Sequence, residues 1–241
     1  MTALLEGRAI DKHFGAFQVL KAVDFSVAPG EAVGIVGPNG AGKTTLFGVL
    51  SGALVPSEGQ VGFGGADITT ADAAGRCRLG IARTHQVPRP FLSMSVFENA
   101  LVAACNGAGL GGHAAETCAT EALRRTGLFA QADRPAAMLG LLDRKRLELA
   151  RALATRPKVL LLDEIGGGLT EAELKLLVAL VSELKADGLT IVWIEHILHA
   201  LLAVIDRLVC LSAGAVIAMG APAEVMADKA VMRAYLGGSI E

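Results

Sequence analysis

The sequence predicts an α/β fold in which a phosphate-binding core carries an antiparallel β-subdomain and an inserted helical subdomain. Two observations lead to this fold class. Short apolar segments, typical of buried parallel strands, alternate with longer segments whose apolar residues recur at helical spacing. One strand segment, residues 32–36, runs directly into Gly37–Thr45, which fits the pattern G-x-x-x-x-G-K-[ST] of a phosphate-binding loop. The 241 residues suffice for one large domain, residues 1–241, with a buried core.

The first third of the chain is predicted to consist mainly of strands joined by tight turns. The predicted strands are residues 4–10, 20–27 and 32–36, a short edge strand near 61–63, and residues 79–84. Phe14 lies in the turn after the first strand, and the helix that follows the loop ends near Gly52. Thr70 is expected to cap a short helix over residues 71–78.

Residues 87–155 are predicted to form the helical subdomain. Two prolines one residue apart exclude a helix or a central strand at its beginning. Ser95 and Glu98 have the spacing of a capping box, which predicts the start of a helix. The predicted helices are residues 95–105, residues 114–126, and a strongly periodic helix that begins at Asp143. We interpret the basic residues of this last helix as a solvated face.

The last third of the chain returns to alternating strands and helices, which completes the predicted α/β core. The predicted elements are strands over residues 158–164 and 190–195, helices over residues 171–186 and near 197–204, a hairpin across Ala213–Gly214, and a short C-terminal helix to Tyr235.

Composition and charge narrow the classes of function. The formal net charge of −2 leaves no basic footprint for nucleic acid. Hydrophobic residues make up 52% of the chain, yet no apolar run approaches the roughly 18 residues that span a bilayer. We therefore expect the chain to bury surface against partner proteins. The N-terminal residues lack a signal-peptide pattern, and the four scattered cysteines fit a cytosolic protein and are given no functional role.

Each residue type in the loop suits the binding of a nucleoside triphosphate. Glycines let the backbone bend tightly and bring its N–H groups against an anion. Lys43 is a compact cation that can reach the terminal phosphates, and the Thr44 hydroxyl is a hard oxygen ligand for Mg²⁺. The helix that follows would point its N-terminus at the phosphates. The candidate binding residues are Gly37, Pro38, Asn39, Gly40, Ala41, Gly42, Lys43, Thr44 and Thr45.

Polar residues follow three of the predicted strands. Asp163 and Glu164 end a strongly apolar strand, and the carboxyl ends of such strands open toward bound ligands. Asp163 can hold Mg²⁺ together with Thr44, while Glu164 can orient or deprotonate the attacking water. His196 could hydrogen-bond a γ-phosphate, and Gln86 could reach Mg²⁺ or the water. For His196 and Gln86, position alone leaves a purely structural role open.

Taken together, these segments resemble the Walker A motif, Q-loop, Walker B motif and switch histidine of ATP-binding cassette (ABC) ATPases, over nearly the whole chain. Finer stretches resemble the ATPase subunits of branched-chain amino acid importers, a group that includes urea and amide importers. These stretches are Gly80–Phe91, Arg144–Ala154 and Ala234–Gly237. The resemblance also places Phe14 where an aromatic ring stacks on adenine, with core packing as the alternative. Residues 88–98 would face the coupling helices of membrane subunits.

The family's signature motif, Leu-Ser-Gly-Gly-Gln, is degenerate in this chain. It falls on Leu139, Gly140, Leu141, Leu142 and Asp143. In the family this motif contacts the ATP held by a second subunit, with a serine hydroxyl and glycine N–H groups. Here Gly140 has no hydroxyl, Leu142 adds a side chain, and Asp143 is expected to cap the following helix and block its N–H groups. Ile165 and Thr170 also replace the family's usual proline and Asn or Asp. We therefore expect a heterodimer rather than a homodimer.

The resemblance implies an ATPase that uses ATP and Mg²⁺ to power import of branched-chain amino acids or related small polar solutes. The implied partners are a second ABC ATPase subunit, two transmembrane permease subunits and, indirectly, a periplasmic solute-binding protein. The implied location is peripheral, on the cytoplasmic face of the inner (plasma) membrane. Three alternatives stay open: a nucleotide-binding subunit with weak hydrolysis, a soluble ABC ATPase of repair or translation, and a phosphate-loop kinase or GTPase. An Asn-Lys-x-Asp motif is absent, which argues against the GTPase.

Overall fold

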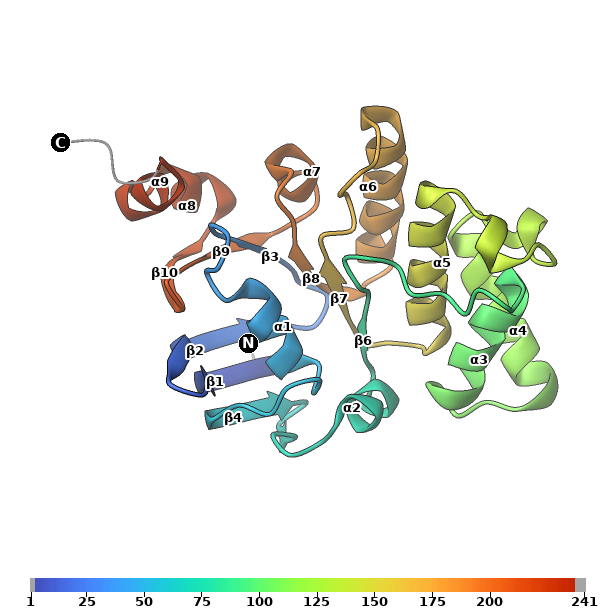
Figure 1. Ribbon diagram of the computed structural model, residues 1–241, viewed down its shortest axis with the longest axis horizontal. Helices are drawn as coiled ribbons and strands as arrows, with labels where there is room; N and C mark the ends of the chain where they lie inside the picture. The colour runs from blue at the N-terminus through green and yellow to red at the C-terminus, as the bar shows by residue number, and fades with distance from the viewer. Residues whose placement is uncertain (1–2, 237–241) are drawn as a thin grey trace.

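The computed structural model describes residues 3–236, and two β-sheets enclose a helix within this part of the chain (Figure 1). Met1 and Thr2 of the N-terminal segment, and Gly237 of the C-terminal stretch Ala234–Gly237, lie outside the described residues. None of the helices within residues 3–236 is long and apolar enough to cross a membrane.

The larger sheet has the strand order β10-β9-β3-β8-β7-β6. Its strands are β3 (Ala32–Val36), β6 (Ile81–Arg83), β7 (Val159–Asp163), β8 (Thr190–Ile194), β9 (Arg207–Ser212) and β10 (Ala215–Gly220). All neighbours are parallel except β9 and β10, which form the predicted hairpin. The predicted strand over residues 79–84 is shorter than expected, because Gly80 adopts a left-handed conformation and ends the preceding helix.

The smaller sheet is antiparallel, with the order β2-β1-β4-β5. Its strands are β1 (Leu5–Phe14), β2 (Phe17–Val27), β4 (Glu58–Phe63) and β5 (Ala66–Asp67). The predicted turn around Phe14 was wrong by a few residues, because β1 and β2 stay paired as far as Phe14 opposite Phe17. The hairpin turn therefore contains only Gly15 and Ala16, and it leaves two phenylalanines side by side at the end of the sheet.

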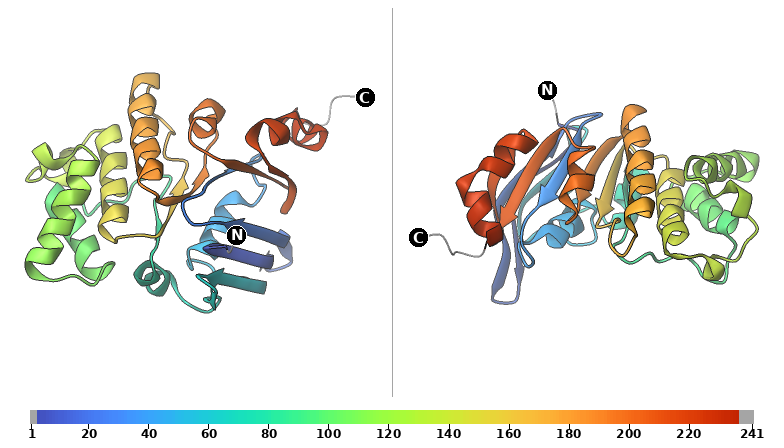
Figure 2. Two further views of the ribbon diagram at one scale, coloured as in Figure 1. Left: turned by 180° about the vertical axis from the view of Figure 1, so that it is seen from behind. Right: turned by 90° about the horizontal axis from the view of Figure 1, so that it is seen from above.

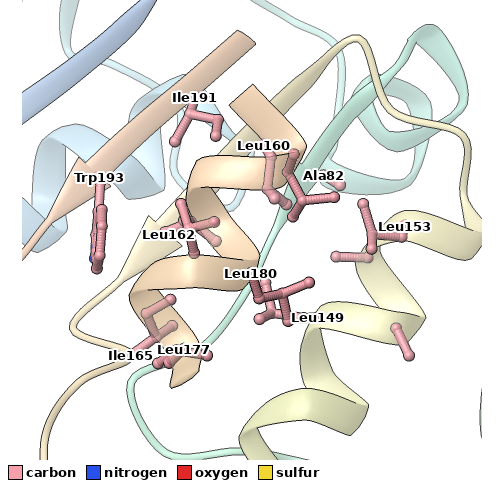
Figure 3. Close-up of a cluster of buried hydrophobic side chains, with 14 of the residues drawn as sticks. Ala82, Leu149, Leu153, Leu160, Leu162, Ile165, Leu177, Leu180, Ile191 and Trp193 are labelled. Carbon is pink, nitrogen blue, oxygen red and sulfur yellow. The ribbon is translucent and has the colours of Figure 1, made fainter. Parts of the chain in front are cut away.

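Successive side chains of the central strands point to opposite faces of the larger sheet, and a hydrophobic core lies on each face. Leu161 of β7 and Ile194 of β8 face α1 (Lys43–Leu50) and the smaller sheet. Their neighbours Leu162 and Trp193 face the opposite side, where α5 (Leu141–Ala154) and α6 (Glu171–Ala186) pack (Figure 3). Both faces of β7 and β8 are buried, which explains why these strands read as continuous apolar runs.

The helices within the predicted helical subdomain gather at one end of the molecule, opposite the C-terminal helices (Figures 1 and 2). They are α3 (Val96–Asn106), α4 (Gly112–Arg125) and α5, with short 3₁₀ turns at Phe129–Gln131 and Ala136–Met138. The remaining helices are α2 (Ala73–Leu79), α7 (Leu198–Leu202), α8 (Pro222–Ala227) and α9 (Lys229–Leu236). The capping box of Ser95 and Glu98 is confirmed.

Two predicted helix starts were wrong. The cap of α2 is Asp72 rather than Thr70, because the Asp72 carboxylate accepts a 2.7 Å hydrogen bond from the backbone N–H of Gly75. Helix α5 begins at Leu141, two residues before Asp143, with Gly140 as its N-cap and no side-chain cap. Asp143 therefore lies inside the first turn of α5.

Candidate active site

The loop between β3 and α1 passes so close to its neighbours that two of its positions have no room for a side chain. At Gly37, with φ of +147°, a Cβ atom would lie 2.1 Å from the carbonyl oxygen of Leu211 on β9. Gly42 is the left-handed N-cap of α1, with φ of 103°. Glycine is therefore required at both positions, and α1 begins with Lys43 directly beneath the loop.

Lys43 is buried, and its ammonium is held by the loop itself. Its Nζ donates hydrogen bonds to the carbonyl oxygens of Gly37 at 2.7 Å and Pro38 at 3.1 Å. Burial lowers the pKa of the Lys43 ammonium, while the nearby carboxylates of Glu164 and Asp163 favour its charged form. The cation is thus kept beside the loop by neutral carbonyl acceptors, which an anionic phosphate oxygen can replace.

A cavity lies over the loop and extends to Glu164, the residue that follows the C-terminal end of β7. Its lining consists of Phe17, Val19, Asn39, Gly40, Ala41, Gly42, Lys43, Thr44, Thr45 and Glu164. The Thr44 side chain is exposed at this cavity, where it is accessible as an oxygen ligand. The structure therefore brings most of the candidate loop residues together with Glu164.

Phe14 is on the rim of the molecule, and the lining of the loop cavity does not include it. Its side chain is 49% exposed, which rules out core packing, and the Lys12 ammonium lies 5.2 Å from the centre of its ring. Phe17, 71% exposed, is the aromatic residue that lines the cavity. Sequence reasoning missed Phe17, although an aromatic residue at each end of a two-residue hairpin was a signal that either could face a ligand.

Glu164 lies between the two other predicted catalytic side chains. The Gln86 side-chain amide donates to Glu164 Oε2 at 2.5 Å, and His196 Nε2 lies 2.8 Å from Glu164 Oε1. Because an ionised carboxylate only accepts hydrogen bonds, the Nε2 atom of His196 carries the proton in this contact. The contact with Gln86 uses the amide nitrogen, so the amide oxygen of Gln86 is left for another partner. The backbone of Glu164 has φ of +47°, a left-handed conformation that residues other than glycine rarely adopt.

Asp163 is almost fully enclosed at the end of β7. Its Oδ2 accepts a 2.7 Å bond from Arg83 Nη2, and only 3% of its side chain is exposed. Its other oxygen, Oδ1, is buried and has no hydrogen-bond partner within the described chain. A buried carboxylate oxygen needs a partner, and Mg²⁺ or a Mg²⁺-bound water would supply one. The donor set of Asp163, Thr44 and the Gln86 amide oxygen thus fits Mg²⁺.

Two charged residues near the site were missed or misread in the sequence. Glu195, buried after β8, accepts hydrogen bonds from the backbone N–H groups of Gly166 at 2.8 Å and His196 at 3.0 Å. Lys145 on α5 is buried, so the interpretation of the basic residues as a solvated face was wrong for this residue. Burial lowers the pKa of Lys145, whereas Glu195 and Glu164 favour its charged form. The signal was available, because Lys145 follows the apolar periodicity of the helix.

The degenerate signature lies at the start of α5 and does not line the loop cavity of the same chain. Asp143 does not cap α5, which corrects the expectation from the sequence. Its carboxylate accepts a 2.9 Å bond from Gln131 Nε2 and pairs with Arg146 at 3.4 Å. Gly140 has extended backbone geometry and open space where a Cβ would stand. The first turn of α5 is therefore less obstructed than predicted, although Leu141 and Leu142 still carry side chains there.

Comparisons with known proteins agree with this geometry. A model of the family "ABC transporter" matches residues 20–166, and one described as "Branched-chain amino acid ATP-binding cassette transporter" matches residues 215–241. The chain is 34% identical over 250 residues to the high-affinity branched-chain amino acid transport ATP-binding protein LivG of Escherichia coli K12, covering 97% of this chain and 98% of LivG. It is 33% identical to BraF of Pseudomonas aeruginosa, a protein of the same description, with 97% and 98% covered.

Among solved structures, the fold matches an ATP-binding cassette of an ABC transporter, MJ1267, in its ADP conformation. The TM-score is 0.89 and the sequences are 35% identical, with 98% of this chain and 100% of that chain covered. The likeness therefore extends over nearly the whole chain.

Proposed function

Because this chain belongs to the ABC transporter family of ATP-binding proteins, we propose that it is the ATP-hydrolysing subunit of an importer for branched-chain amino acids. One observation carries the catalytic part of this proposal. The Glu164 carboxylate lies between Gln86 and His196, at 2.5 Å and 2.8 Å, and it lines the same cavity as Lys43 and Thr44. A candidate base thus lines one cavity with a phosphate-binding loop, and two polar side chains contact that base.

The roles of these residues follow from their chemistry. The loop N–H groups and Lys43 bind the phosphates, and Glu164 orients the attacking water and accepts its proton. In this structure the His196 Nε2–H holds the orientation of Glu164, and the same donor would have to leave Glu164 to bond the γ-phosphate. Thr44, Asp163 and Gln86 would hold Mg²⁺, which supplies neutralisation of the charge on the phosphates. Each Glu164 oxygen accepts one hydrogen bond in this structure and keeps a second lone pair, so a water can bind Glu164 beside Gln86 and His196.

The solute and the partners are proposed from similarity rather than from the site. LivG and BraF are branched-chain amino acid transport proteins by description, and the C-terminal match carries the same description. These matches favour import over a soluble ABC ATPase of repair or translation. We propose a second ATPase subunit, two permeases and a periplasmic solute-binding protein as partners, with this chain on the cytoplasmic face of the membrane.

The experiment is uptake of radiolabelled leucine by cells that lack the gene for this chain. Deletion should abolish high-affinity uptake, and the wild-type gene should restore it. A gene carrying Glu164→Gln should not restore it, because the substitution keeps the shape of the side chain but removes the base. The matched control is Glu171→Gln, an exposed glutamate at the start of α6, which should restore uptake fully.

Parallel uptake assays with urea and a short amide distinguish a wrong solute assignment from a wrong importer assignment. Loss of urea or amide uptake, with leucine uptake unchanged, would move the proposal to another solute. Unchanged uptake of all three solutes would contradict the importer assignment.

A further inference from the structure

An arginine outside the predicted site, Arg83, pairs with the carboxylate that the proposed metal requires. Arg83 is the last residue of β6, and its Nη2 lies 2.7 Å from Asp163 Oδ2. The two side chains are 18% and 3% exposed, so water screens this ion pair weakly. The pair connects the strand before Gln86 to the strand before Glu164.

Several neighbours hold the Arg83 guanidinium in place. Its Nη1 lies 3.4 Å from the Ser51 hydroxyl at the end of α1, and its Cζ lies 5.8 Å from the ring centre of Phe47 on the same helix. The backbone is held as well, because the N–H of Thr84 donates to the Leu161 carbonyl at 2.9 Å. The two terminal nitrogens of the guanidinium thus have partners on β7 and at the end of α1, while Nε is buried without a hydrogen-bond partner within the described residues.

The two oxygens of Asp163 have different surroundings, and the difference indicates what Arg83 does. Oδ2 is bound by Arg83, while Oδ1 is buried without a partner within the described chain. An arginine stays protonated in proteins, so a change of pH does not remove the donor that binds Oδ2. A carboxylate held by one oxygen in this way has a restricted orientation, and its buried second oxygen needs another partner, which a divalent cation or its bound water would supply.

We propose that Arg83 is a positioning residue for metal binding. By holding Oδ2, it fixes the Asp163 carboxylate so that Oδ1 is presented to the divalent cation that accompanies ATP. The inference rests on the proposed nucleotide site but not on the identity of the imported solute. It predicts that loss of Arg83 weakens the metal-dependent part of ATP binding and leaves metal-free ATP binding intact.

The experiment measures ATP binding by the purified chain with calorimetry, once with Mn²⁺ and once with EDTA. Electron paramagnetic resonance of Mn²⁺ gives a second, direct readout of metal binding. Arg83→Met keeps the length of the side chain but removes its charge and its hydrogen bonds. Residues that orient a metal ligand typically contribute about 10–100-fold to metal affinity, so Mn²⁺ binding with ATP should fall by about that factor. Affinity for ATP in EDTA should change by less than about twofold.

Two variants serve as controls. Arg83→Lys keeps a charge but loses the planar fork, so it should restore part of the Mn²⁺ affinity, and it also serves as the test if Arg83→Met fails to fold. Arg78→Met, on the exposed side of α2, should bind Mn²⁺ and ATP like the wild type.

The outcomes separate this inference from the proposed function. Wild-type Mn²⁺ affinity in Arg83→Met would overturn the inference alone, and tighter Mn²⁺ binding would show that Arg83 competes with the metal instead. An equal loss of ATP affinity with and without metal would reduce Arg83 to a structural residue. If the wild-type chain showed no effect of Mn²⁺ on ATP binding, both the metal site and the inference would fail.

Discussion

At the scale of single residues, Lys43 is held in place more tightly than an exposed cation could be. Its ammonium is buried and donates to two loop carbonyls at 2.7 Å and 3.1 Å. The same burial lowers the pKa of Lys43, because little water is left to solvate the charged ammonium. A hydrogen bond from Lys43 to a phosphate oxygen would therefore form in a partly desolvated space, where charge-assisted bonds are strong.

Lys43→Ala should weaken ATP binding by about 1.5–3 kcal/mol, the range for a hydrogen bond to a charged group. Isothermal calorimetry on the purified chain measures this difference directly. Lys175→Ala is the matched control, because Lys175 is exposed on α6 and lies 4.0 Å from Glu171 at the surface. If Lys43→Ala and Lys175→Ala bind ATP equally well, the phosphate-binding assignment of the loop is wrong.

Residues that follow strands could be placed from the sequence, whereas ion pairs between strands could not. Glu164 and His196 each follow an apolar strand, so a parallel sheet brings them to the same edge. The pair of Arg83 and Asp163 depends on the register of β6 against β7, which no local pattern reports. Asp143 was misplaced for a related reason: Gln131 holds it, and that contact is made by a separate segment of the chain.

At the scale of elements, a polar network joins the segment before Gln86 to α5. His85 Nδ1 lies 2.8 Å from Glu148 Oε1, and Arg151 Nη1 donates to Glu148 Oε2 at 2.9 Å. Arg151 Nη1 also donates to the carbonyl of Arg89 at 2.7 Å, and its guanidinium lies 4.9 Å from the ring centre of Phe91. Glu148 is buried, so this network fixes the orientation of the helical subdomain against the core.

Glu148→Ala should destabilise the chain by about 1.5–3 kcal/mol, because it removes the hydrogen bonds that His85 and Arg151 make to a buried carboxylate. Urea unfolding followed by circular dichroism measures the free energy of unfolding. The control is Glu116→Ala, which removes another His–Glu pair: His113 and Glu116 are both exposed and 3.7 Å apart. The control should change stability by less than about 0.5 kcal/mol. Equal effects of the two substitutions would mean that the buried network does not stabilise the junction.

The order of elements was predictable, but several boundaries were not. Helix α6 and strands β3, β7 and β8 have strong periodicity or continuous apolar runs, and the structure confirms them. The start of α5 was missed because Gly140 caps it with backbone geometry alone, leaving no side-chain signal in the sequence. Likewise, the long hairpin of the smaller sheet continues through polar residues, because pairing between the strands outweighs their local preference for a turn.

At the scale of the whole molecule, the chain offers two surfaces to ATP: its own phosphate-binding site, and the signature that would contact the ATP of a second subunit. The residues of the first are intact, whereas those of the second are altered. The loop and Glu164 line one cavity, and Gln86 and His196 contact Glu164, whereas the signature at the start of α5 lacks a serine hydroxyl at Gly140. Leu142 adds a side chain where close approach is expected. One lost bond to a charged group costs about 1.5–3 kcal/mol, which weakens binding at the opposite site about tenfold or more. Since Asp143 does not cap the helix, its predicted contribution to this loss is withdrawn.

We therefore expect an asymmetric heterodimer, with fast hydrolysis at the site that combines this chain's loop with an intact signature from its partner. Single-turnover ATP hydrolysis in the assembled transporter tests this most directly, with Lys43→Ala compared against the equivalent lysine change in the partner ATPase. Lys43→Ala should remove most of the fast turnover, and the partner's change should remove little. Equal losses from the two changes, or brisk hydrolysis by a purified homodimer of this chain, would contradict the account.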